Sequence, residues 1–182
     1  MLASPEDVLN FWFVEHGEDD WFGGKPEFDA ALAARFADTH AAVARGEAAH
    51  WRTSAEGRLA EIIVLDQFSR QLFRDDARAF ATDPMALDLA RAAVAVEADH
   101  ALEPRRRTFC YMPYMHSESL EVHDTEAIPL FTELGDAETL KFEIAHRDVL
   151  ARFGRYPKRN AALGRESTEE EKRYIEQEDG MF

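Results

Sequence analysis

The sequence predicts an all-α protein with a single domain over residues 1–182. Apolar residues recur at three-to-four-residue steps along most of the chain, and this spacing places them on one face of a helix. No stretch shows the sustained apolar–polar alternation, closed by hairpin turns, that is typical of strands. With 182 residues and 46% hydrophobic composition, the chain is long enough to bury one sizeable core. It contains no low-complexity linker and no clear internal repeat at a fixed period.

Start and stop signals delimit the first three helices. Ser4 and Pro5 have the form of an N-cap and a first-turn proline, and Gly17 is expected to end the helix that they open. A second amphipathic helix is predicted over residues 28–46, where a glycine is the stop signal. The third helix is expected to open at residues 53–56, Thr-Ser-Ala-Glu, which have the form of a capping box.

Caps and prolines also mark where the later helices begin. Their start signals are Asp83-Pro84, Pro104, Ser117, Asp136 and the run Ser167 to Glu171. Pro129 must kink or divide the helix that begins at Ser117, because a proline inside a helix removes a backbone hydrogen bond. The helix from Asp136 is expected to turn one side toward the core, formed by Phe142, Ala145, His146, Val149 and Phe153.

The chain is strongly acidic, with a formal net charge of -15 and a pI near 4.8. Nucleic acids and anionic membranes require a broad positive field, so neither is expected as a partner. The single cysteine, Cys110, has no second cysteine to pair with and is expected to be a buried, inert thiol. The N-terminus has no signal-peptide pattern, and the longest apolar runs are far shorter than a membrane span. We therefore expect a cytoplasmic protein without a membrane segment.

One segment departs from this acidity. Residues 152–165, RFGRYPKRNAALGR, contain five cations and no acid, and we name them the basic island. The cations are Arg152, Arg155, Lys158, Arg159 and Arg165. Glycine and proline keep the backbone of the island irregular, so several cations and an asparagine could converge there. Two interpretations stay open: the island binds an external anion, or acids of the chain itself neutralise it.

Two charged residues and two histidines stand out on or beside predicted helices. Asp66 and Arg70 are four residues apart on an apolar face, so they form an internal ion pair or belong to a site. His146 adjoins the apolar row of its helix, and His116 precedes Glu118 where a loop passes into a helix. Both histidines suit acid–base catalysis or metal binding, and both also suit a core or capping role.

Three Glu-x-x-His pairs raise the alternative of a metal site, because this spacing occurs in di-iron helix bundles. The pairs are Glu47/His50, Glu97/His100 and Glu143/His146. Two of them lie at predicted helix ends, and the further glutamates of such a site cannot be placed, so we expect no metal and no cofactor. The sequence also lacks the glycine motifs that bind phosphates and the serine nucleophile elbow, which argues against nucleotide-dependent and serine-hydrolase chemistry by these routes.

Five segments are most informative when they are taken together and in order. They are VLNFWF, LDQFSRQLFR, AFATDPMALDLA, RTFCYMPYMHSE and AHRDVLARFGRYPKRNAALGRESTEEE. In this combination they resemble a bacterial family known as a domain of unknown function with a tetratricopeptide-like helical fold. The resemblance covers nearly the whole chain and implies an array of antiparallel helices without the usual repeat signature. It implies no established activity.

The family pattern singles out a set of polar residues that are all present in this chain. They are Asp66, Gln67, Arg70, His116, Ser117, Glu118, His146, Arg155, Arg159 and Asn160. The resemblance thus implies that these residues share one site. The chain departs from the pattern at Ser69, where proline is usual, at Gln71, where asparagine is usual, and at Lys158, where histidine is usual. The last departure replaces a titrating group of the basic island by a permanent cation.

The leading hypothesis is a polar pocket that binds a small anionic ligand or the acidic terminus of a peptide. Arg70, Arg155 and Arg159 would clamp the anion, because guanidinium groups match carboxylates and phosphates. Asn160 would orient the anion, and Asp66 would hold an arginine in place.

Two alternatives stay open beside this hypothesis. In the first, the same pocket belongs to an enzyme, with His116 or His146 as the acid–base group and Glu118 orienting it. In the second, the motif residues form a structural ion network, and exposed helix faces bind a protein partner. A binding or catalytic pocket requires accessible space among these residues, whereas a scaffold predicts that they are paired with one another.

Overall fold

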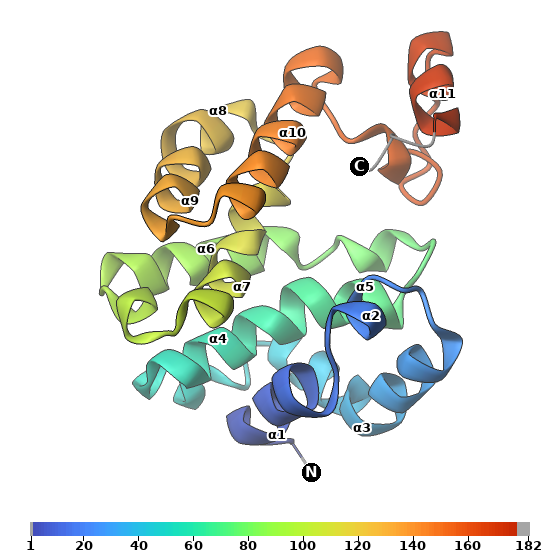
Figure 1. The fold of residues 1–182 in the computed structure, drawn as a ribbon. Helices are drawn as coiled ribbons and strands as arrows, with labels where there is room; N and C mark the ends of the chain where they lie inside the picture. Colours follow the sequence, from blue (N-terminus) through green and yellow to red (C-terminus); the bar gives the residue numbers. More distant parts are fainter. Residues whose placement is uncertain (1, 178–182) are drawn as a thin grey trace. The chain divides into compact units, whose positions relative to one another are not determined.

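The computed structural model describes residues 2–177, and the elements in this range are helices without any strand (Figure 1). The prediction of an all-α protein is confirmed. The chain divides into two compact units: the residues up to Arg74 with Arg78–Pro113, and Asp75–Ala77 with the residues from Tyr114 onward. None of the helices in the described range has both the length and the apolar character needed to cross a membrane.

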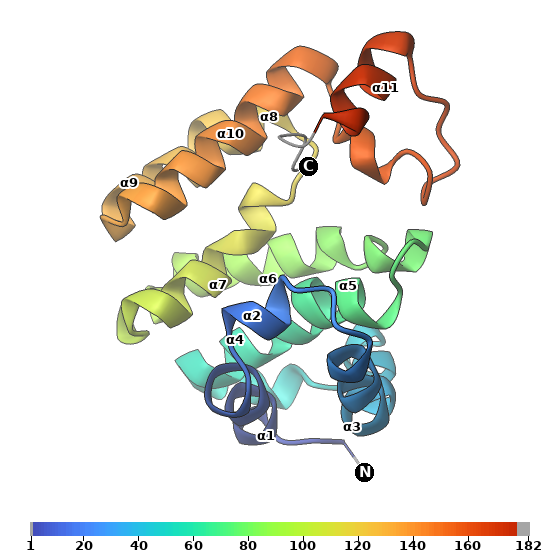
Figure 2. The same ribbon diagram turned by 45° about the vertical axis from the view of Figure 1, so that its right-hand side comes forward.

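The first unit is organised around one central helix. Its α-helices are α1 (Pro5–Asn10), α2 (Glu18–Trp21), α3 (Pro26–Ala44), α4 (Ala55–Ile63), α5 (Ser69–Leu72) and α6 (Asp83–Ala95). Helix α4 packs against both α1 and α6 (Figure 2). Beside it, Trp12 stacks on Trp21 with ring centroids 5.1 Å apart, and the Trp21 indole N–H donates to the Trp12 carbonyl. Large aromatic rings bury the most apolar area per residue, so they anchor this unit.

The second unit is smaller and follows helix α7 (Pro104–Met115). Its helices are α8 (Leu120–Val122), α9 (Ile128–Leu134), α10 (Ala137–Phe153) and α11 (Glu169–Glu176). Helices α9 and α10 lie side by side and are joined at Gly135, whose φ of 78° favours glycine (Figures 1 and 2). Val149, Leu150 and Tyr156 form a compact hydrophobic core beside the C-terminal part of α10.

Most of the helices begin at or near the caps and prolines that the sequence predicts. The side chains of Ser4, Asp136 and Thr168 cap α1, α10 and α11. Ser54 caps α4, but its hydroxyl accepts from the backbone N–H of Gly57. Gly57, rather than the glutamate of the predicted capping box, therefore occupies the third helical position. A side chain at Gly57 would meet the carbonyl oxygen of Trp51 at 1.9 Å from its Cβ, which accounts for the glycine.

π-Helical turns interrupt the α-helices at three places in the described part of the chain. These turns are η1 (Phe11–Glu15), η3 (Val64–Phe68) and η6 (His123–Ala127). The helix predicted from Ser117 begins at Leu120 instead, and η6 divides it before Pro129. Pro129 thus lies in the first turn of α9, where its missing backbone donor costs little. Because π-helical turns are rare and often mark functional sites, their positions are informative.

The buried side of α10 differs from the prediction. Phe142 is 45% exposed, whereas the adjacent Glu143 is fully buried. A glutamate is seldom buried unless it is paired, and Glu143 contacts the buried His123 at 2.5 Å. The polar partner on another helix therefore decides which face of α10 is inside, and apolar periodicity alone does not predict it.

Arg52 and Glu61 allow a test of what a buried charge pair contributes to the fold. Arg52 donates from Nε and Nη2 to the two carboxylate oxygens of Glu61, both at 2.7 Å, and the Glu61 side chain is fully buried. Arg52→Ala leaves this carboxylate without its counterion, so the free energy of unfolding should fall by about 3 kcal/mol in urea denaturation.

The matched control is Arg45→Ala, which removes an exposed pair with Glu47. We expect this change to lower the free energy of unfolding by less than about 1 kcal/mol, because exposed pairs are well solvated without each other. Equal effects of the two substitutions would contradict the importance of burial for the pair of Arg52 and Glu61.

Candidate functional site

The predicted site residues are divided between the two units. Asp66 and Arg70 belong to the first unit. The others belong to the second unit and are His116, Glu118, His146, Arg155, Arg159 and Asn160. The geometry within the second unit alone brings several of the predicted residues together.

In the first unit, Arg70 is held by two carboxylates. Its guanidinium lies 3.2 Å from Oδ1 of the fully buried Asp66. It also donates to both carboxylate oxygens of Asp83, each at 3.0 Å. Gln67 donates to the second oxygen of Asp66 at 2.6 Å. Asp66 thus holds an arginine, as the leading hypothesis requires, but Asp83 places a carboxylate of the chain itself in the fork of that arginine.

In the second unit, acids of the chain neutralise much of the basic island. Arg165 donates to both carboxylate oxygens of Glu118, at 2.9 and 3.0 Å. Arg155 donates in the same two-pronged way to Glu171, at 2.6 and 2.8 Å. Arg152 pairs with Glu170 at the surface. The sequence left two interpretations of the basic island open. For these three arginines, the structure agrees with the second, in which acids of the chain itself neutralise the cations.

Glu118 and Asn160 have hydrogen-bond partners other than those that their predicted roles require. Glu118 accepts from Arg165 and from the backbone N–H of Tyr156, so its carboxylate braces the island rather than orienting a histidine. Burial opposes ionisation of Glu118, but these hydrogen bonds outweigh it and hold its pKa below the ordinary value. The fully buried Asn160 accepts from Arg165 and donates to Ser167, which makes it part of the same brace.

Arg159 and His146 contact the ring of Tyr156, and His116 lies next to both of them. Arg159 lies over this ring, 4.7 Å from its centroid, and donates to the carbonyl oxygen of His116 at 2.9 Å. His146, on α10, meets the ring edge-on, with centroids 5.6 Å apart. The rings of His116 and His146 are 6.3 Å apart. We name His116, His146, Tyr156 and Arg159 the histidine–arginine cluster.

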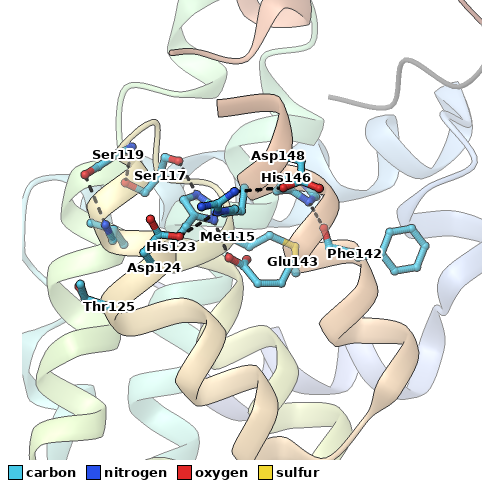
Figure 3. Close-up of polar contacts among 12 residues, drawn as sticks. Met115, Ser117, Ser119, His123, Asp124, Thr125, Phe142, Glu143, His146 and Asp148 are labelled. Atoms are coloured by element: carbon cyan, nitrogen blue, oxygen red, sulfur yellow. Dashed lines mark hydrogen bonds and ion pairs between the residues drawn. The ribbon is translucent and has the colours of Figure 1, made fainter. Parts of the chain in front are cut away.

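The protonation of His146 follows from its surroundings. Its Nδ1 faces the backbone carbonyl of Phe142 at 2.8 Å, so this nitrogen carries the proton of the neutral ring (Figure 3). Burial, followed by repulsion from His116, lowers the pKa of His146 to about 2. The ring is therefore neutral near pH 7, and its Nε2 is a hydrogen-bond acceptor.

Beside the cluster lies a buried pair that the sequence did not single out as a site. Nδ1 of His123 is 2.5 Å from Oε1 of Glu143, and both side chains are fully buried (Figure 3). Nε2 of His123 is 2.9 Å from the carbonyl oxygen of Ser117 and 3.2 Å from the hydroxyl oxygen of Tyr156. In the sequence, the Glu-x-x-His spacing drew attention to Glu143. His123 lies in an acidic helical segment and belongs to no motif that would have singled it out.

Among residues 2–177, no group of three or more acid, histidine or cysteine side chains is arranged to hold a metal ion. Among the three Glu-x-x-His pairs, Glu47 bonds to Arg45 and Glu143 bonds to His123. These two glutamates therefore take part in hydrogen bonds within the chain. Cys110 is buried, and burial raises the pKa of its thiol to about 12.

Comparisons with known proteins place this arrangement in a family. A family model described as a bacterial protein of unknown function (DUF924) matches residues 8–179, and the chain belongs to this family. A solved structure, of the protein of unknown function ATU0120 from Agrobacterium tumefaciens, is similar, with a TM-score of 0.89 and 39% sequence identity. The match covers 94% of this chain and 96% of that one. None of the curated proteins matches.

Arg155→Ala should loosen helix α11. Glu171, which is 2% exposed, would lose its two-pronged donor at the start of this helix. We expect hydrogen exchange of the α11 amides to speed up by about tenfold or more, as for the loss of one charge-assisted interaction. Arg152→Ala, which removes the exposed pair with Glu170, is the matched control and should leave exchange nearly unchanged. Similar exchange in both variants would contradict the role of Arg155.

The same contact predicts a pH dependence. Hydrogen bonds from Arg155 are the largest cause that lowers the pKa of Glu171 from 4.5 to about 2. Because the pKa is lower in the folded protein, the stabilisation is fully present above pH 4.5 and is lost as the pH falls toward 2. Exchange at α11 in the wild-type protein should therefore approach that of Arg155→Ala over this window. A constant difference between the two proteins down to pH 2 would exclude this linkage.

Proposed function

We propose that the histidine–arginine cluster binds a small anion, a carboxylate or a phosphate. The observation that carries the proposal is Arg159, which stacks on Tyr156 and donates to the backbone carbonyl of His116 within a single unit. Arg159 is a permanent cation, and its stacking on Tyr156 restricts where its donors can lie. A preoriented guanidinium loses less conformational entropy when it binds a ligand.

The electrostatics at His146 support this proposal. After burial, charge interactions with His116, His123 and Arg159 lower its pKa. Arg159 is the permanent cation among these groups, in a chain whose net charge is -15. The acidic surroundings disfavour large polyanions, whereas a small anion interacts mainly with the nearby cations.

The neighbouring arginines support a small ligand rather than a peptide terminus. Arg155 already bonds an acidic segment of the chain, through the backbone carbonyl of Glu166 and the carboxylate of Glu171. Arg165 is likewise engaged with Glu118. In this proposal Arg155 and Asn160 support the site, and Arg159, which lies over Tyr156 and beside the His116 carbonyl, is the expected anion donor. His116 and Arg159 are partly exposed, which suits contact with a ligand.

The two alternatives receive less support. A general base works best when its pKa is near the working pH, so the low pKa of His146 fits an acceptor better than a catalytic base. His116 remains the candidate acid–base group of the enzyme hypothesis. The paired arginines fit a structural network, and the tetratricopeptide-like array that would suit a scaffold stays a prediction.

The test is isothermal titration of the protein with inorganic phosphate and with a small dicarboxylate. At 100 times its Kd, a true ligand adds about 2.7 kcal/mol to the free energy of unfolding, so thermal shifts provide a second readout. Arg159→Gln should raise the Kd by about tenfold or more, because it removes the charge and keeps a polar side chain.

Lys158→Gln is the matched control, since it removes the same charge from the adjacent, exposed position. It should change the Kd by about twofold at most, as expected for a screened surface charge. If phosphate and the dicarboxylate leave the wild-type protein unaffected, or if both substitutions weaken binding equally, this anion site is excluded.

A further inference from the structure

We infer that Glu143 and His123 are positioning residues of the histidine–arginine cluster. This pair holds the Tyr156 hydroxyl and the Ser117 carbonyl, and so sets the places of Arg159, His146 and His116. The functional meaning of the inference rests on the proposed anion site, but the positioning itself does not.

The hydrogen atoms around His123 can be assigned from the chemistry of its neighbours. The Ser117 carbonyl only accepts, so Nε2 of His123 carries a proton and donates to it. The Tyr156 hydroxyl donates to the carbonyl of Met115 at 2.7 Å, which leaves its oxygen as an acceptor toward the same Nε2. One proton then lies between Nδ1 of His123 and Oε1 of Glu143. Whichever atom holds it, the pair is neutral overall.

Burial of these two ionisable side chains costs free energy of folding, which argues for a role beyond stability. Both side chains are fully buried, and Oε2 of Glu143 has no hydrogen-bond partner among the described residues. Burial is the largest influence on Glu143 and raises its pKa. Replacing a buried ionic pair by apolar residues is often neutral or stabilising, so packing alone does not explain why one is present here. Local violations of this kind are concentrated at functional sites.

Secondary structure supports the same conclusion. His123 is the first residue of the π-helical turn η6, and α8 and α9 flank this turn on either side. A π-helical turn changes the register of the helix by inserting a residue, and such turns are frequent at functional sites. Both α9 and η6 pack against α10, which supplies Glu143. Figure 3 shows His123 between Ser117 and Glu143.

Two short routes connect His123 to the cluster. Through the Tyr156 hydroxyl it holds the ring that Arg159 covers and that His146 meets edge-on. Through the Ser117 carbonyl it holds the backbone next to His116, whose own carbonyl accepts from Arg159. One imidazole therefore contacts the segment next to His116 and the segment of Tyr156 and Arg159, and through Glu143 it also contacts α10, which carries His146. A shift of His123 would move both segments, and with them the guanidinium of Arg159.

The test compares Glu143→Leu with Glu143→Gln by NMR. The Tyr156 ring shifts the resonances of the Arg159 side chain and of the His146 ring, so these signals report where that ring lies. In Glu143→Leu, which fills the space without a hydrogen bond, we expect both sets of signals to lose most of their ring-current shift. In Glu143→Gln, whose amide can donate to Nδ1 of neutral His123, most of the shift should return. Glu138→Gln, at an exposed position of α10, is the control.

Phosphate titration of the same samples separates this inference from the proposed function. Wild-type binding that weakens by about tenfold in Glu143→Leu and recovers in Glu143→Gln supports both. Ring-current shifts that are lost in Glu143→Leu, when the wild-type protein binds neither phosphate nor the small dicarboxylate, support the positioning and exclude the anion site. Unchanged shifts in a folded Glu143→Leu protein overturn the positioning, whatever the titration gives.

A further measurement needs only the wild-type protein, in case the leucine variant does not fold. A long-range ¹H–¹⁵N spectrum reports which nitrogens of His123 carry protons. We expect Nε2 to be protonated at neutral pH, with the remaining proton between Nδ1 and Glu143. An unprotonated Nε2 would break the contact with the Ser117 carbonyl and overturn the inference.

Discussion

The structure depends on the requirement that a carboxylate taken out of water must keep a donor. Glu61, Glu143 and Glu171 are all buried, and each lies against an arginine or a histidine of another element of the chain. Removing the partner of a buried charge costs far more than the pair itself contributes. These contacts therefore specify which helix faces meet, even in a chain whose net charge is -15.

In the second unit, this requirement governs several cations of the basic island. Arg155 and Arg165 are bound by acids of the chain and hold the irregular backbone between α10 and α11 in shape. Arg159 is stacked on Tyr156 and bonded to a backbone carbonyl, close to two histidines. The same group of cations thus supplies both the support and the candidate site. The buried pair of His123 and Glu143 extends this support to the hydroxyl of the tyrosine.

Membership of a family of bacterial proteins of unknown function makes the physical argument more important. The similar structure from Agrobacterium tumefaciens is also that of a protein of unknown function, so it offers no activity to transfer. A fold by itself seldom identifies a function, whereas charge, burial and geometry limit what a site can bind. The proposal of a small anion rather than a peptide terminus rests on such features, because an acidic segment of the chain itself already binds Arg155.

The sequence by itself determined the helical class, most helix starts and the conspicuous polar residues, because caps, prolines and apolar spacing act within a few residues. It also placed His116, His146 and Arg159 among the candidates. Only the tertiary structure decided which cations meet acids, that Glu143 rather than Phe142 is buried, and that His123 belongs beside the site. Those outcomes depend on contacts between segments far apart in the chain, and local patterns carry no information about such partners.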